Sequence, residues 1–348
     1  MISNCNLEPF IRDFREAVSN ESTKHVGRAR DSYWAACRRW RAERPPGVKA
    51  QDRWLPGSAG SIPVRCYTPV GADRSAILYL HGGGWSLGDL DSHDGIAADL
   101  AARSQHVVIA VHYRRTPEAP FPAPLEDVWS VWVSLSNLGL FPVATCGDSA
   151  GGSLAAALSL LAYERANPAP LAQGLIYPVL WDPQEPGTLG TTDDLLTPEQ
   201  VQESWNLYWS NSAAGSLAMA APGHAADPGA FAPTCILHGP EDPLTPGIER
   251  FEAILGSNGI TVKRIAAPGL VHGSLHAHGH IAFVSQAWRQ FVAELVLLIN
   301  ARRTAVRSTM PEDDHSGQYD GARFGPPENP GVAIMTGRLP WTRNHGPE

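Results

Sequence analysis

The sequence has few cysteines, and their spacing does not indicate a metal site or a disulfide framework. Its five cysteines are scattered, with no C-x-x-C pair: Cys5, Cys37, Cys66, Cys146 and Cys235. An odd, dispersed set argues against a disulfide framework or a cysteine-ligated zinc site. It favours a reducing compartment, so we expect a cytoplasmic protein. Cys146 and Cys235 stand in apolar, strand-like runs, where buried structural thiols are expected.

Positive charge and long apolar runs are also scarce. Charged residues make up 18% of the 348 residues, the formal net charge is −8, and the basic residues form no long run. Nucleic acid and anionic membranes attract basic surfaces, so neither is expected as a partner. The opening residues MISNCNLEPFIRDFREAV carry charges where a signal peptide needs its apolar stretch, and no later run is expected to span a bilayer.

Hydrophobic residues make up 43% of the chain, enough for one large α/β domain. Over about 48–179, short apolar runs typical of strands alternate with helical patterns. The alternation resumes from the strand-like PTCILHG at 233–239 to a last helix over about 281–303. This order predicts a mostly parallel central sheet flanked by helices, in a domain spanning 48–303. The polar segment 304–348, which contains many Gly and Pro residues, is predicted to be a tail.

Two further segments are predicted to form a helical cap. Residues 1–47 show helical spacing of aromatic residues. Residues 181–228 interrupt the strand–helix alternation and contain one helix in which Trp205, Tyr208 and Trp209 share a face. Ordinary packing against the domain is enough to explain both segments. A lid over a cavity is the more specific, functional interpretation.

The first motif that carries chemistry is GDSAG at 147–151, which fits G-x-S-x-G. In this motif a sharp strand-to-helix turn lifts a serine hydroxyl above the sheet, and the flanking glycines avoid clashes. VATC before the motif is strand-like, and SLAAALSLLAYER after it is helical. Ser149 is therefore the predicted nucleophile, with a structural Gly-Ser turn as the alternative.

The second motif is HGGGW at 81–85, directly after the strand-like SAILYL. A glycine run there lets backbone N–H groups approach a ligand without a side chain in the way. Such a loop supplies oxyanion donors in lipases and esterases, together with the N–H of the residue after the nucleophile, here Ala150. A flexible glycine loop is the alternative.

The predicted base is His272. It lies in a loop after the strand-like ITVKRIAA and is followed by Gly273. A histidine can accept a serine proton near neutral pH. Its rivals in VHGSLHAHGH run into the last helix, and the cluster lacks the adjacent cysteine or carboxylate that would favour a metal site. No metal or cofactor is expected. The rivals are His276, His278 and His280.

The carboxylate that orients the base is expected between serine and histidine in the sequence. Asp242 and Glu241 follow the strand-like PTCILHG, at the carboxyl end of the sheet where such sites form. Asp242 is the better candidate, and Glu241 remains its competitor. The other aspartates of this stretch lie in the irregular insertion: Asp182, Asp193, Asp194 and Asp227.

Taken together, these motifs resemble the hormone-sensitive-lipase-like family of bacterial carboxylesterases. The match covers about 48–303, with HGGGW, YRRTPEAPFPAPLED at 113–127, GDSAGG, LIYPVL, LHGPEDPL and VHG in the family's order. The resemblance implies the α/β-hydrolase fold with a helical cap, and a homodimer as one assembly. It implies cleavage of short-chain carboxylic esters through an acyl-enzyme. The alternatives are an amidase, lactonase or arylformamidase with the same residues, or a non-catalytic receptor similar to the plant gibberellin receptor.

The resemblance also implies roles for individual residues. Its triad falls on Ser149, Asp242 and His272, which favours Asp242 over Glu241. The sequence departs from the family in having His112 for an aspartate, Arg115 for a leucine and Ser274 for an aromatic residue. These departures concern the pocket wall and local hydrogen bonds. The family's oxyanion donors fall on Gly83, Gly84 and Ala150.

Overall fold

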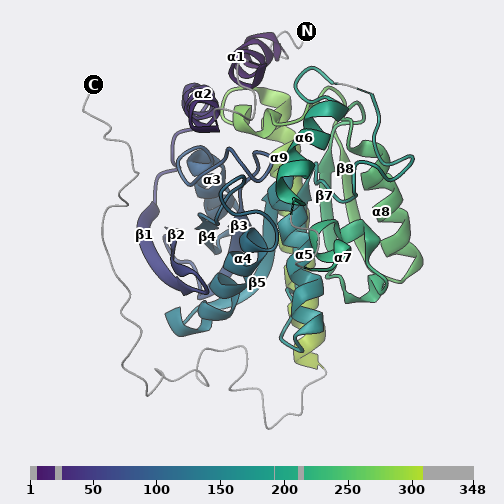
Figure 1. Cartoon of the computed structure of the whole chain (residues 1–348). Coiled ribbons are helices and arrows are strands. Elements are labelled where there is room, and N and C mark those ends of the chain that lie inside the picture. Colours follow the sequence, from purple (N-terminus) through teal and green to yellow (C-terminus); the bar gives the residue numbers. More distant parts are fainter. Residues whose placement is uncertain (1–5, 20–25, 192, 211–214, 309–348) are drawn as a thin grey trace.

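The structure is a computed structural model that describes residues 6–19, 26–191, 193–210 and 215–308 (Figure 1). These residues form an eight-stranded sheet with the strands β1 Val48–Gly57, β2 Gly60–Pro69, β3 Ser75–Leu80, β4 Val107–Val111, β5 Phe141–Asp148, β6 Ala172–Ile176, β7 Thr234–His238 and β8 Val262–Ala266. The strand order is β1-β2-β4-β3-β5-β6-β7-β8. β2 pairs antiparallel with both of its neighbours, and all other pairs are parallel.

The predicted mostly parallel sheet is confirmed. Every residue of β3 and β4 is buried, which explains why continuous apolar runs predicted these strands. The sequence does not predict β1, an edge strand that is only partly buried and lacks such a run. β1 forms by pairing along its whole length with β2, from Val48 opposite Pro69 to Gly57 opposite Gly60.

Helices cover both faces of the sheet (Figure 1). Ile77 and Tyr79 of β3 belong to one core cluster, whereas Leu78 and Leu80 belong to the other, because successive side chains point to opposite faces. The first cluster includes residues of α3 Asp94–Ser104 and α9 Ala282–Ser308, and the second includes residues of α4 Ala123–Ser134, α5 Ala150–Glu164 and α8 Thr245–Ser257. Two short 3₁₀ turns are η2 Ser136–Leu138 and η6 Ser274–Ala277.

The cysteines of the described residues are free thiols. Cys146 in β5 and Cys235 in β7 are buried, as expected from their apolar runs. Cys37 is also buried, Cys66 is half-buried, and Cys5 lies outside the described residues.

Helix α9 corrects one expectation. Its residues 282–306 are long and apolar enough to cross a membrane by length and composition, whereas the sequence predicts no such segment. Buried residues of this helix recur at helical spacing and pack in the core, which accounts for the composition; among them are Trp288, Phe291, Val292 and Leu295. The helix continues to Ser308, past its expected end near 303, and the rest of the predicted tail lies outside the described residues.

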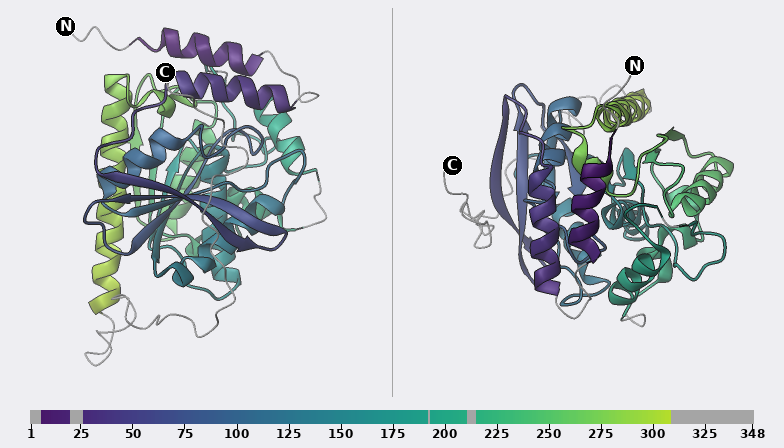
Figure 2. Two further views of the ribbon diagram at one scale, coloured as in Figure 1. Left: turned by 90° about the vertical axis from the view of Figure 1, so that its left-hand side faces the viewer. Right: turned by 90° about the horizontal axis from the view of Figure 1, so that it is seen from above.

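Helices α1 (Glu8–Ser19) and α2 (Val26–Arg39) lie side by side across one end of the molecule (Figure 2). Phe14 of α1 and Tyr33 of α2 are buried in the same core cluster as α9. Their rings pack edge to face, with centroids 6.1 Å apart. The two helices are thus attached to the sheet domain by apolar and aromatic contacts.

The insertion at 181–228 contains α6 (Pro198–Tyr208). Trp205 and Tyr208 of this helix are buried, and the Tyr208 ring stacks on Trp85 with centroids 4.1 Å apart. The aromatic face that the sequence shows is therefore packed against the loop after β3. The remaining elements of the insertion are short: α7 Leu217–Ala220, η4 Pro222–His224 and η5 Pro228–Ala230.

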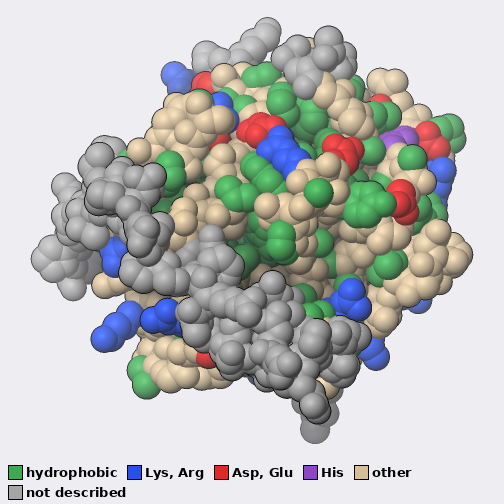
Figure 3. Space-filling view, turned by 90° about the horizontal axis from the view of Figure 1, so that it is seen from below, with side chains coloured by type: hydrophobic (Ala, Val, Ile, Leu, Met, Phe, Trp, Pro, Cys, Tyr) green, Lys and Arg blue, Asp and Glu red, His purple; other side chains and the backbone are tan. Residues whose placement is uncertain are grey.

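The end of the molecule opposite α1 and α2 carries charges of both signs (Figure 3). Basic and acidic side chains alternate with hydrophobic ones on this face, and neither sign gathers into one patch in the part drawn in colour. The exposed large hydrophobic residues among those described lie on separate segments: Val70, Val133, Tyr163 and Leu297.

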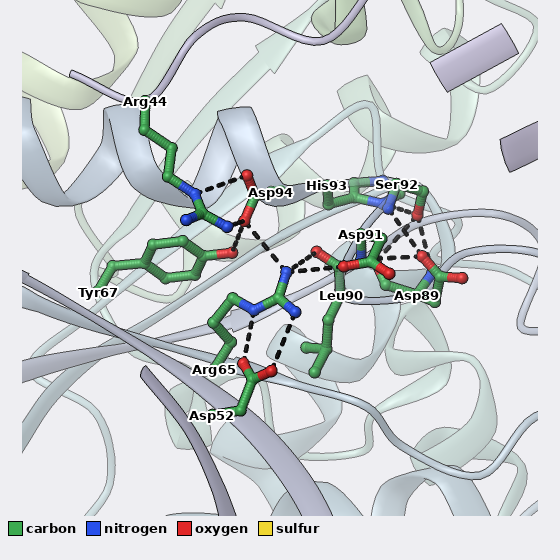
Figure 4. Close-up of polar contacts among 10 residues, drawn as sticks. All are labelled: Arg44, Asp52, Arg65, Tyr67, Asp89, Leu90, Asp91, Ser92, His93 and Asp94. Carbon is green, nitrogen blue, oxygen red and sulfur yellow. Dashed lines mark hydrogen bonds and ion pairs between the residues drawn. The ribbon is translucent and has the colours of Figure 1, made fainter. Parts of the chain in front are cut away.

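A cluster of buried ion pairs joins β1, β2 and the start of α3 (Figure 4). Arg65 of β2 donates from Nε to Asp52 of β1 at 2.6 Å. Its Nη1 donates to Asp91 at 2.9 Å and to Asp94 at 3.1 Å. Arg44 also donates to Asp94, at 2.7 Å. Because the side chains of Arg65 and Asp94 are only 6% and 3% exposed, each charge relies on its partners in place of water.

We expect Arg65→Ala to lower the free energy of unfolding by about 3–5 kcal/mol, because it leaves buried carboxylates without a counter-charge. Urea unfolding of the two proteins measures the difference. The control is Arg264→Ala: this side chain is 40% exposed and pairs with Glu249 at the surface, so a loss below about 1 kcal/mol is expected. Equal losses in the two variants would contradict the importance of the buried cluster.

Candidate active site

Ser149 occupies the sharp turn between β5 and α5. Its backbone has φ +52° and ψ −120°, which residues with a side chain rarely adopt, and α5 begins at the next residue. The turn depends on its glycines. A side chain at Gly147 would overlap the backbone oxygen of Gly151, and one at Gly151 would overlap that of Leu80. The strand–turn–helix expected around Ser149 is present.

The fold brings His272 and Asp242 to Ser149 from distant parts of the sequence. Nε2 of His272 lies 2.9 Å from Oγ of Ser149, and Nδ1 lies 2.9 Å from Oδ2 of Asp242. The Asp242 side chain is fully buried, and its other oxygen accepts the backbone N–H of Leu244 at 2.9 Å. A carboxylate at Nδ1 selects the tautomer that carries its proton there, which leaves Nε2 able to accept the serine proton.

The surroundings of His272 favour its protonated form. Burial opposes the charge, but the charge of Asp242 and its hydrogen bond outweigh burial, and the charge of Asp193 adds to them. The pKa of His272 is therefore raised above its usual value. Oδ2 of Asp193 also accepts the backbone N–H of His272 at 2.7 Å, and the ring of Tyr177 packs on the imidazole with centroids 4.6 Å apart.

Asp193 and Tyr177 have roles that sequence reasoning does not find. Asp193 is one of the aspartates of the insertion, which the sequence favours less than Asp242 as the orienting carboxylate. In the structure it contacts the backbone of His272, not the ring. Nothing in the local sequence distinguishes it from its neighbour Asp194. Only the folded chain shows that the insertion returns to the loop that carries the histidine.

The other candidates lie apart from Ser149. Glu241 is exposed, and no hydrogen bond links it to His272 in the described structure. His276 is buried, with Nε2 3.1 Å from the hydroxyl of Tyr33. Within the described residues, no group of three or more His, Cys, Asp or Glu side chains is arranged to hold a metal ion. The two remaining histidines of the cluster are His278, which is buried, and His280, which is exposed.

The glycine loop after β3 borders the cavity that Ser149 and His272 line. Gly83, with φ +103°, and Gly84, with φ +56°, line it together with Ser149 and His272. Ala150 is the first residue of α5, where backbone N–H groups have no partner within the helix. The three residues predicted as oxyanion donors thus lie beside the serine.

Asp148 connects this loop to the nucleophile turn. Its Oδ1 accepts the hydroxyl of Tyr79 at 2.7 Å and the backbone N–H of Gly82 at 3.1 Å. Its Oδ2 lies 3.3 Å from Nε2 of His93. Burial opposes ionisation of this carboxyl, but the charge of His93 and the hydrogen bonds from His93 and Tyr79 hold its pKa well below the usual range. The carboxylate is therefore ionised in the interior, where it links the glycine loop to the nucleophile turn. The motif G-x-S-x-G does not reveal this role.

The cavity above Ser149 has a volume of about 210 Å³. A side chain at Gly84 would overlap Oγ of Ser204 in α6, so the insertion helix closes directly on the glycine loop. Helices α1, α2 and α6 supply much of the wall, through residues that include Phe14, Ala29, Tyr33, Val201 and Leu207, and Leu196 just before α6 adds to it. The size and polarity of the cavity are thus set by segments outside the central sheet.

We expect Asp148→Asn to lower the free energy of unfolding by about 1–3 kcal/mol, because an amide cannot accept all three donors that meet the carboxylate. Turnover should fall as well, since Gly82 loses its fixed partner next to Gly83. Chemical unfolding and steady-state kinetics measure the two effects. Tyr79→Phe is the matched control: it removes one donor and leaves the carboxylate on Gly82, so its turnover should fall less.

Comparisons with known proteins agree with this fold. A family model for the alpha/beta hydrolase fold matches residues 77–276. Esterase LipI of Mycobacterium tuberculosis is 30% identical over 272 residues, covering 73% of this chain and 84% of LipI. Carboxylesterase NlhH of the same organism is 34% identical over 244 residues, covering 66% and 76%. A hyperthermophilic esterase from the archaeon Pyrobaculum calidifontis superposes with a TM-score of 0.75 at 26% identity, covering 84% of this chain and 98% of that one.

The family model covers more than half of the chain, and LipI and NlhH extend the likeness over most of the sheet domain. The resemblance inferred from HGGGW, GDSAGG and the later motifs is confirmed. The chain belongs to the α/β-hydrolase fold family, and its similarity to LipI and NlhH assigns it to the esterases of that family.

Proposed function

We propose that the protein hydrolyses short-chain carboxylic esters with Ser149 as nucleophile, His272 as general base and Asp242 as the group that orients the base. The observation that carries the proposal is the continuous chain of contacts from Oγ of Ser149 to Nε2 of His272 and from Nδ1 to Asp242, each 2.9 Å long. Ser149 and His272 line a cavity that can admit a small molecule, and Asp242 is buried behind the histidine.

The reaction has two acyl-transfer steps. His272 takes the proton of Ser149 as Oγ attacks the ester carbonyl, and the tetrahedral oxyanion accepts hydrogen bonds from the N–H groups of Gly83, Gly84 and Ala150. The C–O bond to the alcohol breaks as His272 returns the proton to the leaving oxygen. Water then attacks the acyl-enzyme with His272 again as base, which releases the carboxylic acid and restores the serine. These steps require no metal or organic cofactor.

The walls of the cavity support a small, apolar acyl group. Side chains such as Phe14, Val201 and Leu207 line a volume of about 210 Å³, which leaves little room for a long acyl chain. The contacts of His272 with both Ser149 and Asp242 argue against the alternative of a non-catalytic receptor. Residues 1–47 and 181–228 act as the cap in this proposal, and a homodimer in the cytoplasm remains the predicted state.

Ser149→Ala should reduce turnover of p-nitrophenyl butyrate by about 10⁴-fold or more, because the nucleophile and its base act as one unit. The measurement is initial-rate release of p-nitrophenol, with the acetate and octanoate esters alongside. Rates should fall from the short esters to octanoate. The control is Ser153→Ala: this serine lies one turn further along α5, is also buried, and donates from its hydroxyl to the Ala220 carbonyl at 3.4 Å. Its activity should remain close to that of the wild type.

Activity that survives Ser149→Ala would reject Ser149 as the nucleophile. A folded wild type that is inactive on all three esters but cleaves an anilide or a lactone would replace the ester substrate and keep the triad. Inactivity on every acyl substrate, together with failure of a fluorophosphonate to label Ser149, would reject catalysis by this site.

The rate should depend on the neutral form of His272. Because its pKa is raised above the usual value, kcat/KM should fall as the pH drops through that raised pKa and level off above it. Asp193→Asn removes one of the charges that raise this pKa, so the acid limb of the pH profile should move to lower pH. Asp194→Asn is the control, since that carboxylate pairs with Arg15 at the surface. A limb that moves equally in both variants would contradict the assignment.

A further inference from the structure

A second cavity, of about 470 Å³, lies next to the glycine loop that borders the catalytic cavity. Arg30 of α2 and Arg115 line it, and both reach the backbone of that loop. Nε of Arg30 donates to the carbonyl of Ser86 at 2.8 Å. Nη1 of Arg115 donates to the carbonyls of Leu87 at 3.1 Å and Gly88 at 2.6 Å. The two cavities have no lining residue in common, and the link between them is that these arginines bind the backbone of the glycine loop.

The positive charges of this cavity are unequally balanced. Arg30 pairs with Glu118 at 2.7 Å, and Arg114 pairs with Asp127 at 2.7 Å. Arg115 is held only by the two carbonyls, and it forms no ion pair with any carboxylate in the described part of the chain. The cavity therefore contains three guanidinium groups and two carboxylates, which leaves one cation unmatched.

The environment of Arg115 agrees with an uncompensated charge. Burial and the charge of Arg30 lower the pKa of Arg115, and the carboxylates of Asp89 and Glu118 only partly oppose this. His112 lines the same cavity as Arg115.

The geometry of Arg115 suits an oxyanion. Its hydrogen bonds to the loop all use Nη1, so Nε and Nη2 donate to none of the described residues. Two adjacent N–H groups of a guanidinium match the two oxygens of a carboxylate. The lining also contains apolar side chains, among them Trp54, Ile62, Pro63 and Ala119.

We propose that this cavity binds an organic carboxylate, whose oxygens accept from Nε and Nη2 of Arg115 and whose apolar body lies against Trp54 and Ile62. The bound anion supplies the missing negative charge. The apolar lining favours an organic anion over an inorganic one of similar charge. Binding here does not depend on Ser149 being the nucleophile.

The test is isothermal titration of the protein with benzoate at constant ionic strength, with benzamide as the neutral probe of the same shape. Inorganic phosphate is titrated as the anion without an apolar body. We expect one site for benzoate on the wild type, weaker binding of phosphate and no measurable binding of benzamide. Arg115→Gln keeps a donor for the loop carbonyls but loses the charge, and should weaken benzoate binding by about tenfold or more. Arg264→Gln, a surface variant far along the sequence on β8, should bind as the wild type does.

Two further arms distinguish binding in this cavity from binding at the catalytic histidine and from loss of the fold. His272→Ala removes the cation of the catalytic cavity, so benzoate binding that persists in it lies elsewhere. Thermal unfolding of each variant checks that it is folded. If Arg115→Gln does not fold, protection of Arg115 in the wild type from phenylglyoxal by benzoate, read by mass spectrometry, takes its place.

Four results would overturn the proposal: no saturable binding of benzoate, equal binding of benzamide or inorganic phosphate, undiminished binding by Arg115→Gln, or loss of binding in His272→Ala. In the phenylglyoxal experiment, equal labelling of Arg115 with and without benzoate would do the same.

Discussion

The buried carboxylate of Asp148 is the interaction on which the geometry of the site depends. It accepts a hydrogen bond from Tyr79 in β3 and another from the backbone of Gly82, and it contacts His93. Partners within residues 79–93, from the end of β3 to the start of α3, therefore meet the distant nucleophile turn at one charge beside Ser149. An ionised group in a buried place must have such partners, because its desolvation is otherwise too costly. The same requirement fixes the glycine loop relative to the nucleophile turn.

A second buried charge extends this arrangement away from the catalytic cavity. Arg65 holds Asp91 and Asp94, which flank the His93 that contacts Asp148. The end of the glycine-loop segment that leads into α3 is thus fixed by ionic contacts with Arg65 (Figure 4). In contrast, Arg115 holds the carbonyls of the glycine loop from a cavity in which its own charge is unmatched. The difference lies in the number of carboxylates within reach, not in the depth of burial alone.

The sequence predicted the parts of the fold whose pattern is local. Continuous apolar runs indicated the buried parallel strands, and the glycines around Ser149 indicated a turn that tolerates no larger side chain. The edge strand β1 escaped prediction because it is only half-buried and its stability comes from pairing with β2. The sequence predicts no run apolar enough to span a membrane, yet the buried face of helix α9 makes that helix apolar enough by composition. The local sequence pattern does not predict how much of the surface of a helix will be buried by neighbouring elements.

The sequence by itself determined the order and spacing of chemically necessary residues: a serine in a glycine turn, a glycine loop before it, and an acid and a histidine after it. Those features depend on backbone conformation and side-chain chemistry, which are properties of short segments. Only the tertiary structure decided that Asp193 returns to the backbone of His272, that α1, α2 and α6 wall the cavity, and that Arg115 faces a second one. These are contacts across long sequence separations, and their geometry exists only once the sheet has brought the loops to one edge.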